Sequence, residues 1–201
     1  PSSIWGLFGN SKSFGGWYIP QEINDLEWQG NTEQTLLFNW LKDVSDYAYS
    51  KSENKTIMIA PFNNLWQPAD VIKNWYESLF SIAPNINSVF PQDGVGIGLK
   101  DINYHIPLYF DAIKSACDNY NRTFGATIES FSQLTGWPID NGSFSAESSS
   151  IQILKNQLAE AATHTNDIIQ FSWGYMQQDL TISSTNHFSY LLSPLPLVYF
   201  R

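Results

Sequence analysis

The fold of this 201-residue chain is constrained most by a regular alternation of continuous apolar runs with amphipathic stretches. Five apolar runs have the length of buried β-strands, and they begin about 30 to 45 residues apart, which is the size of a strand–helix unit. They cover residues 14–19, 56–62, 87–92, 123–128 and 168–173. Because strands that alternate with helices form a parallel sheet covered on both faces, the sequence predicts an α/β fold, with residues 1–201 as a single domain.

The segments between the apolar runs carry signals of helix starts. Asn31 and Gln34 form a capping-box pattern ahead of apolar residues at helical spacing. These apolar residues are Leu36, Leu37, Trp40, Leu41 and Val44. The other helices are predicted to begin at Pro68, Pro107, Ser145 and residue 184. The single cysteine, Cys117, lies on the apolar face of the helix that follows Pro107, so we expect it to be buried.

The composition excludes several classes of partner. A formal net charge of −9 argues against nucleic acid and anionic membrane surfaces. No apolar run approaches the roughly 18 to 20 residues of a membrane span. Glycosylation sequons at Asn54, Asn121 and Asn141 favour a secreted or extracellular protein. The chain begins at Pro1 rather than at Met, so we expect a processed product or a piece of a longer protein.

Metal-dependent and serine hydrolysis find little support in the sequence. His105, His164 and His187 lack the spacing of a metal site. No Gly-x-Ser-x-Gly motif marks a serine nucleophile. We therefore expect neither a metal nor another cofactor.

Two glutamates that are far apart in the sequence are the candidate catalytic residues. Glu22 follows the apolar run at 14–19, and Glu129 ends the run at 123–128. The carboxyl ends of parallel strands form the functional face of α/β folds. Paired carboxylates on such a face are what glycoside hydrolysis requires, so the sequence indicates first a protein that acts on sugars.

Aromatic and polar residues near the same strand ends are candidate substrate-binding residues. The chain contains 8 Trp, 10 Tyr and 13 Phe, and flat rings can stack on the faces of sugars. The candidates are Trp17, Tyr18, Asn64, Trp66, Gln92 and Asp93. Three alternatives stay open for Asp93: it contacts a substrate hydroxyl, it supports one of the glutamates, or it is a plain turn residue before Gly94.

Four motifs carry a resemblance to a known family: Gly15-Gly-Trp-Tyr-Ile-Pro-Gln-Glu22, Ile59-Ala-Pro-Phe62, Pro91-Gln-Asp-Gly-Val-Gly96 and Thr127-Ile-Glu-Ser-Phe131. Residues 14–173 resemble the later part of a glycoside-hydrolase-like (β/α)₈ barrel family, which is found mainly in bacteria and is largely of unassigned activity. The resemblance implies that the five strands are the fourth to the eighth of a TIM-type barrel. The first three strand–helix units are then absent, and a second polypeptide completing the barrel, a longer parent protein or an open sheet would account for this.

The resemblance also implies roles for individual residues. Glu22 corresponds to the acid/base and Glu129 to the nucleophile of a retaining glycoside hydrolase. Trp173 corresponds to an aromatic floor beneath the sugar. Gln21 departs from the pattern, because the larger clan usually has Asn before its acid/base.

Two other classes of function are compatible with the same features. One is a lectin-like barrel that binds carbohydrate without turnover, and the other is a purely structural subunit of an assembly. Measured turnover on a panel of glycans separates the enzyme from the binding protein.

Overall fold

The computed structural model describes residues 2–52, 55–64, 67–98, 101–137 and 139–172. Its helices are α1 (Ser2–Phe8), α2 (Asn31–Lys51), α3 (Ala69–Ile82), α4 (His105–Asn119) and α5 (Ile151–His164). Its strands are β1 (Gly16–Ile19), β2 (Thr56–Ile59), β3 (Ser88–Val89), β4 (Thr123–Phe124), β5 (Ala126–Glu129), β6 (Phe131–Thr135), β7 (Ser145–Ser148) and β8 (Ile168–Phe171). The helix predicted from residue 184 lies outside the described residues.

The strands that alternate with helices are parallel. Strands β1, β2, β3 and β4 form one sheet in that order, and β5 pairs with β8. Strand β5 continues β4 after Gly125, and a parallel bridge between Gln92 and Thr127 connects it to the chain that follows β3. The five predicted strands are therefore all present in parallel order, and the α/β class is confirmed.

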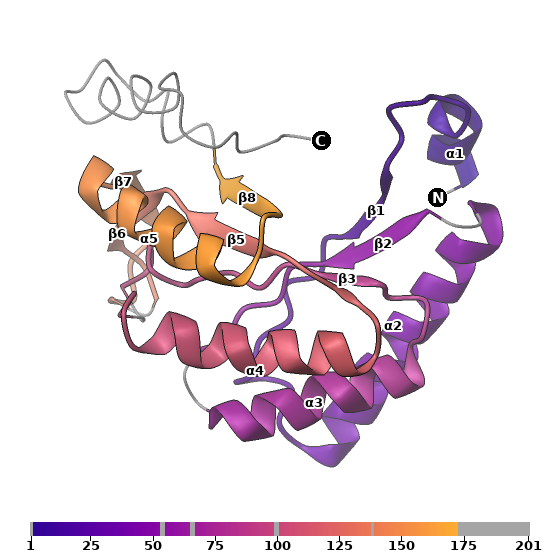
Figure 1. Ribbon diagram of the computed structural model, residues 1–201, viewed down its shortest axis with the longest axis horizontal. Helices are drawn as coiled ribbons and strands as arrows, with labels where there is room; N and C mark the ends of the chain where they lie inside the picture. Colours follow the sequence, from indigo (N-terminus) through magenta and orange to yellow (C-terminus); the bar gives the residue numbers. More distant parts are fainter. Residues whose placement is uncertain (1, 53–54, 65–66, 99–100, 138, 173–201) are drawn as a thin grey trace.

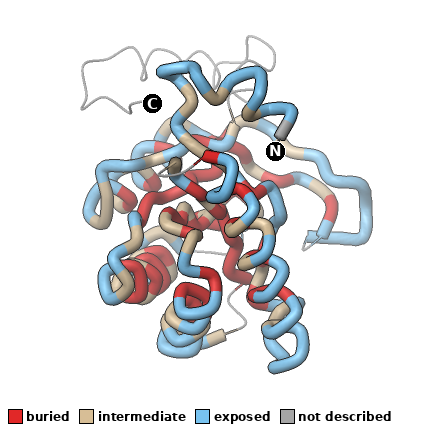
Figure 2. Tube along the Cα trace, turned by 90° about the vertical axis from the view of Figure 1, so that its right-hand side faces the viewer, coloured by how far each residue is buried: buried red, intermediate tan, exposed pale blue. Residues whose placement is uncertain are grey.

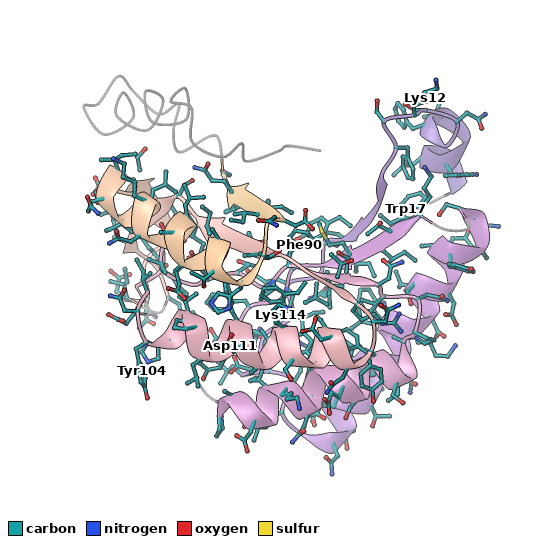
Figure 3. All side chains as sticks on the ribbon, in the orientation of Figure 1. Lys12, Trp17, Phe90, Tyr104, Asp111 and Lys114 are labelled. Carbon is teal, nitrogen blue, oxygen red and sulfur yellow. The ribbon has the colours of Figure 1, made fainter. Side chains whose placement is uncertain are left out.

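Gly125 lies between β4 and β5, where the Phe90 ring fills the space that a side chain at position 125 would need. A Cβ atom at position 125 would lie 2.1 Å from a carbon of the Phe90 ring, far inside van der Waals contact. Figure 3 labels Phe90 among the strands in the middle of the molecule. Only glycine lets the backbone pass this close to an aromatic ring.

Helices α2 to α5 pack against one face of the strands. Ile57 and Ile59 on β2 and Ile128 on β5 are fully buried, and they belong to a single core cluster. That cluster includes Leu41 of α2, Tyr76 of α3, Ile113 of α4 and Leu154 of α5. Burying one side chain of this size contributes about 1.5–3 kcal/mol, so the cluster is the main source of stability. Figure 2 shows the buried residues gathered between the strands and the helices.

The opposite face of the strands carries exposed apolar side chains. Successive side chains on a strand point to opposite faces, so Tyr18 on β1 lies on the face away from Ile19. Tyr18 is exposed, and so are Ile169 and Phe171 on β8. The expectation that helices cover both faces is therefore wrong for the described part of the chain, where α2 to α5 share one core on one side (Figure 1).

Cys117 is fully buried in α4, as the helical pattern predicts. Burial disfavours the charged thiolate and raises the pKa of this thiol to about 12. The side chain therefore acts as a small apolar residue of the core.

The predicted start of α2 differs from the structure. Gly30, not Asn31, is the N-cap of α2, and it provides no side-chain cap. The Gln34 side chain donates instead to the carbonyl oxygen of Gln29 at 3.0 Å. Leu36 and Trp40 of α2 are exposed, because the buried stripe of this helix contains their neighbours Leu37, Phe38 and Leu41.

Ser145 begins a strand rather than a helix. Strands β6 and β7 form an antiparallel hairpin directly after β5, and α5 begins only at Ile151. Ser150 is the N-cap of α5, and its hydroxyl accepts a hydrogen bond from the backbone N–H of Ile153 at 3.3 Å. The sequence of β7, Ser-Ala-Glu-Ser, has no β-branched or aromatic residue, so nothing in it signals a strand.

Candidate active site

A cleft of about 490 Å³ lies at the carboxyl ends of the parallel strands. Glu22 and Glu129 both line it, although Glu22 follows β1 and Glu129 ends β5, more than 100 residues later in the chain. Amide side chains line it as well, from Asn24, Asn64, Gln92 and Gln133. Aromatic rings line it too, from Phe62, Phe131, Trp137, Phe144 and Phe171. Leu26, Ile97 and a third carboxylate, Glu27, are also part of the lining. The prediction that the two glutamates lie at one edge of the sheet is confirmed.

Glu129 is the last residue of β5 and is only 3% exposed. Its Oε2 atom accepts hydrogen bonds from the backbone N–H groups of Gly96 at 2.8 Å and Ile97 at 3.3 Å. Backbone N–H donors favour the ionised form of a carboxylate over its neutral form, and they fix the orientation of the Glu129 side chain.

Gly96 lets the loop after β3 approach Glu129. A Cβ atom at position 96 would lie 2.8 Å from the Cβ atom of Glu129 and 2.9 Å from its Oε2 atom. It would also lie 2.8 Å from the carbonyl oxygen of Phe131. The absence of a side chain at position 96 is therefore a requirement of the carboxylate site.

Asp93 and Gln157 support Glu129 from the side of the core. Asp93 Oδ1 accepts a hydrogen bond from the backbone N–H of Glu129 at 3.3 Å, and its Oδ2 accepts one from Gln157 Nε2 at 2.8 Å. Gln157 Nε2 also donates to the carbonyl oxygen of Glu129 at 2.9 Å. Both side chains are buried. Asp93 Oδ1 also accepts a hydrogen bond from the backbone N–H of Val95 at 3.1 Å, as in an Asp turn. Asp93 does not line the cleft, so the structure agrees with two of its three alternatives, the turn residue and the support of a glutamate, and not with a substrate contact.

Glu22 is held in a different way. It lies in the loop after β1 and is exposed, and its Oε1 atom accepts a hydrogen bond from Gln92 Nε2 at 3.4 Å. Gln92 Nε2 also donates to the carbonyl oxygen of Ala60 at 3.0 Å, which fixes this amide in the cleft wall. Tyr18 is about half exposed; its partial burial raises the pKa of the phenol, and the negative charge of Glu22 raises it further.

The predicted binding residues separate into three groups. Asn64 and Gln92 line the cleft, whereas Trp17 and Tyr18 do not. Trp66 and Trp173 lie outside the described residues.

Trp17 lies away from the cleft because of its position on β1. Its side chain points to the same face as Ile19, and its indole N–H donates to the Ser52 hydroxyl at the end of α2. The ring also packs edge-on against Phe14, with ring centroids 5.1 Å apart. Figure 3 labels Trp17 near α1, well away from the β6–β7 hairpin that contributes to the cleft. A contact of Trp17 with substrate is therefore not supported.

Asn64 is buried in the wall of the cleft. Its backbone N–H donates to the carboxylate of Asp25, which also accepts from the backbone N–H of Gln67 at 3.3 Å. The side-chain oxygen of Asn64 is buried and has no hydrogen-bond partner among the described residues.

The hairpin residues of the cleft were missed at the sequence level. Trp137 and Phe144 flank the turn-rich segment after β6, and Phe131 and Gln133 lie on β6 itself. The alternation of Phe131-Ser-Gln-Leu-Thr135 was a usable signal of a half-buried strand.

A second, smaller cavity does not compete with the cleft. It measures about 60 Å³ and is lined mainly by apolar side chains, including Trp28, Trp75 and Tyr76. This volume suits a few water molecules rather than a sugar. The described residues contain no group of three or more His, Cys, Asp or Glu side chains suited to a metal ion. Within the same part of the chain, no helix is long and apolar enough to cross a membrane.

Comparisons with known proteins agree with the fold. A solved chain from Bacteroides thetaiotaomicron VPI-5482, named "putative alpha-L-fucosidase", matches with a TM-score of 0.70 and 18% sequence identity. The match covers 94% of this chain but 58% of that chain, and at this identity it shows a shared fold alone. A search of curated protein sequences found no match. A family model described as "Domain of unknown function (DUF4434)" matches residues 2–179, so the chain belongs to the DUF4434 family.

Proposed function

We propose that this chain provides both catalytic carboxylates of a retaining glycoside hydrolase. The observation that carries the proposal is that Glu22 and Glu129, delivered by two different strands, line one cleft at the carboxyl edge of a parallel sheet. Its aromatic and amide wall suits the apolar faces and the hydroxyl groups of a sugar. The fold shared with the Bacteroides protein named as a fucosidase is compatible with this assignment.

In the proposed mechanism, Glu129 attacks the anomeric carbon and forms a glycosyl ester, while Glu22 gives its proton to the leaving oxygen. Glu22 then takes a proton from a water molecule, which attacks the same carbon and releases Glu129. The hydrogen bonds from Gly96 and Ile97 suit Glu129 to the role that needs an oriented anion. The exposure of Glu22 suits it to the role that exchanges protons with water and with the leaving group.

The proposed barrel needs more strands than the structure describes. Within the described residues, β1 pairs only with β2, and β8 pairs only with β5, so each has an open edge. Unpaired strand edges favour association with further strands. The exposed side chains of Tyr18 and Phe171 form an apolar face, which favours packing of further protein segments against it. We expect strands from another polypeptide segment to close a (β/α)₈ barrel over this face. A monodisperse, active monomer of this chain alone would contradict that expectation.

The direct test is the stereochemistry of the first product. Aryl glycosides and oligosaccharides with the commoner pyranose units are incubated with the protein, and the anomeric form of the released sugar is followed by NMR before it mutarotates. Retention supports the two-carboxylate mechanism, and inversion rules it out. Extracellular location is a separate expectation, in keeping with the exposure of Asn121 and Asn141 in their sequons.

A second candidate function is carbohydrate binding without turnover. It is favoured by the loose attachment of Glu22, for which the structure describes one side-chain hydrogen bond, at 3.4 Å. Binding needs only the aromatic and amide wall. Glycans that bind to the unmodified protein but are never cleaved would support this candidate over the enzyme.

A further inference from the structure

The β6–β7 hairpin brings exposed aromatic side chains to the cleft beside Glu129. It begins two residues after Glu129, and Figure 1 shows it at the end of β5, next to α5. Trp137 and Phe144 line the cleft with 56% and 54% of their surface exposed. Large exposed aromatic residues that gather beside a cleft are typical of binding surfaces rather than of folding cores.

The backbone under Trp137 is firmly held. The Gln133 side chain is buried, and its Nε2 atom lies 3.0, 3.0 and 2.9 Å from the carbonyl oxygens of Thr135, Gly136 and Trp137, which share its two N–H donors. Asp140 Oδ1 accepts from the backbone N–H of Gly136 at 2.7 Å. The indole is therefore exposed on a pre-organised support, which lowers the entropy lost when a ligand stacks on it.

The hairpin is also continuous with the rest of the aromatic wall. Phe131 packs edge-on against Phe144, with ring centroids 5.8 Å apart, and against Phe171 of β8 at 6.3 Å. Phe131 is itself buried, so it supports the exposed rings on either side of it. These rings form a wall that runs from the tip of the hairpin to the strand that pairs with the Glu129 strand.

The size of the cleft exceeds the needs of one sugar ring. Its volume of about 490 Å³ falls among pockets of roughly 300 to 1,000 Å³, which hold ligands of several rings. Glu129 and Trp137 both line this space, Glu129 from the end of β5 and Trp137 from the β6–β7 hairpin. A ligand of two or more linked sugars can therefore contact both.

We infer that the β6–β7 hairpin forms a second sugar subsite, in which Trp137 stacks on the ring next to the one at Glu129. The preferred ligand is then an oligosaccharide rather than a single sugar. The inference rests on the proposed function, because it takes the glycan at Glu129 as its starting point. It assigns to Trp137 a role in specificity, with Phe144 as its neighbour on the same wall.

The test compares Trp137→Ala with Trp137→Phe and with Trp40→Ala. Trp40 is a matched control, because it is 43% exposed on α2 and does not line the cleft. Calorimetry measures binding of neutral gluco-, xylo-, manno- and fuco-configured sugars of one to four units. We expect the unmodified protein to bind the best oligosaccharide at least about tenfold more tightly than its single sugar. We expect Trp137→Ala to lose about tenfold for oligosaccharides alone, Trp137→Phe to lose less, and Trp40→Ala to change nothing.

The outcomes separate the inference from the proposed function. Equal affinity of the unmodified protein for single and linked sugars would overturn the subsite. An unchanged affinity in Trp137→Ala, or an equal loss for single and linked sugars, would do the same while leaving the role of the two glutamates intact. A complete lack of glycan binding would overturn the proposed function and the inference together. Circular dichroism of each variant confirms that the fold is kept, as expected for an exposed side chain.

Discussion

Glu129 and Glu22 face the same cleft, but the molecule holds them in opposite ways. Glu129 is buried, and it is contacted by backbone N–H groups of the loop after β3. Its own backbone is held by Asp93 and by Gln157 of α5. Glu22 is exposed, and its carboxylate has one described hydrogen bond, to Gln92.

The difference suits the two glutamates to the two different roles proposed for them. A nucleophile must stay ionised and aligned, and these are the effects of close N–H donors and a packed backbone. An acid/base group must exchange protons with the leaving group and with water, which exposure permits.

Glu129→Gln is expected to abolish turnover, with a loss of at least about 10⁴-fold in kcat, because an amide cannot form the covalent intermediate. Steady-state kinetics on an activated aryl glycoside measure the loss. Glu147→Gln is the matched control, since Glu147 lies on β7, is exposed and does not line the cleft. If Glu129→Gln turned over substrate as fast as the unmodified protein, Glu129 could not be the nucleophile.

Glu22→Gln is expected to slow substrates with poor leaving groups by about 10²- to 10⁴-fold, because these depend on protonation. Substrates with an activated phenol as leaving group should be slowed much less in the first step. The slope of log kcat/KM against the pKa of the leaving group measures the difference. An equal loss across all leaving groups would argue against the acid/base role.

Gly96→Ala is expected to reduce kcat by on the order of 10²-fold, because the new Cβ must displace the Glu129 carboxylate or the loop that holds it. The free energy of unfolding should fall by about 1–3 kcal/mol. Gly15→Ala is the control, since a Cβ at position 15 meets nothing within 4 Å. Unchanged kinetics in Gly96→Ala would show that Glu129 tolerates a shift and is not tightly positioned.

Gln157→Leu removes the hydrogen bonds to Asp93 Oδ2 and to the carbonyl oxygen of Glu129. We expect a loss of about 1–3 kcal/mol in unfolding free energy, with kcat reduced more than KM is raised. Gln152→Leu on the exposed face of α5 should leave both quantities unchanged. A purely structural role for Gln157 would appear as lost stability without any change in kcat at a temperature where the variant is folded.

The smallest effect concerns the ionisation of Tyr18. Its pKa is raised by burial and, to a lesser extent, by the charge of Glu22. Removing that charge in Glu22→Gln makes the phenolate less unfavourable, so Tyr18 should lose its proton at a lower pH than in the unmodified protein. Ultraviolet difference titration against Tyr18→Phe measures the change, and Glu129→Gln should leave it unaltered.

The parallel strands and the buried cysteine could be predicted because they depend on local patterns. The spacing of apolar runs identified all five parallel strands, and helical periodicity placed Cys117 in the core. The capping-box prediction at Asn31 was wrong, because the Gln34 side chain donates its hydrogen bond to the carbonyl oxygen of Gln29 instead. The β6–β7 hairpin was missed because β7 is polar and gains its stability from its partner strand.

The candidate site could be predicted only in part, for a related reason. Glu129 ends β5 and Glu22 lies in the loop directly after β1, and the carboxyl ends of parallel strands meet at one edge wherever such a sheet forms. The supports of Glu129 come from a loop and a helix distant in the sequence, at Gly96 and Gln157. No local pattern connects a glutamine on α5 with a carboxylate on β5.

The α/β class, the parallel order of the strands and the position of the two glutamates at one edge could all be predicted from the amino-acid sequence. These follow from the periodicity of apolar residues and from the geometry of parallel sheets. The tertiary structure alone decided which glutamate is buried, that Asp93 points to the core and that Trp17 lies away from the cleft. Burial and hydrogen-bond partners depend on segments far apart in the chain, and these become neighbours only after the helices pack on the strands.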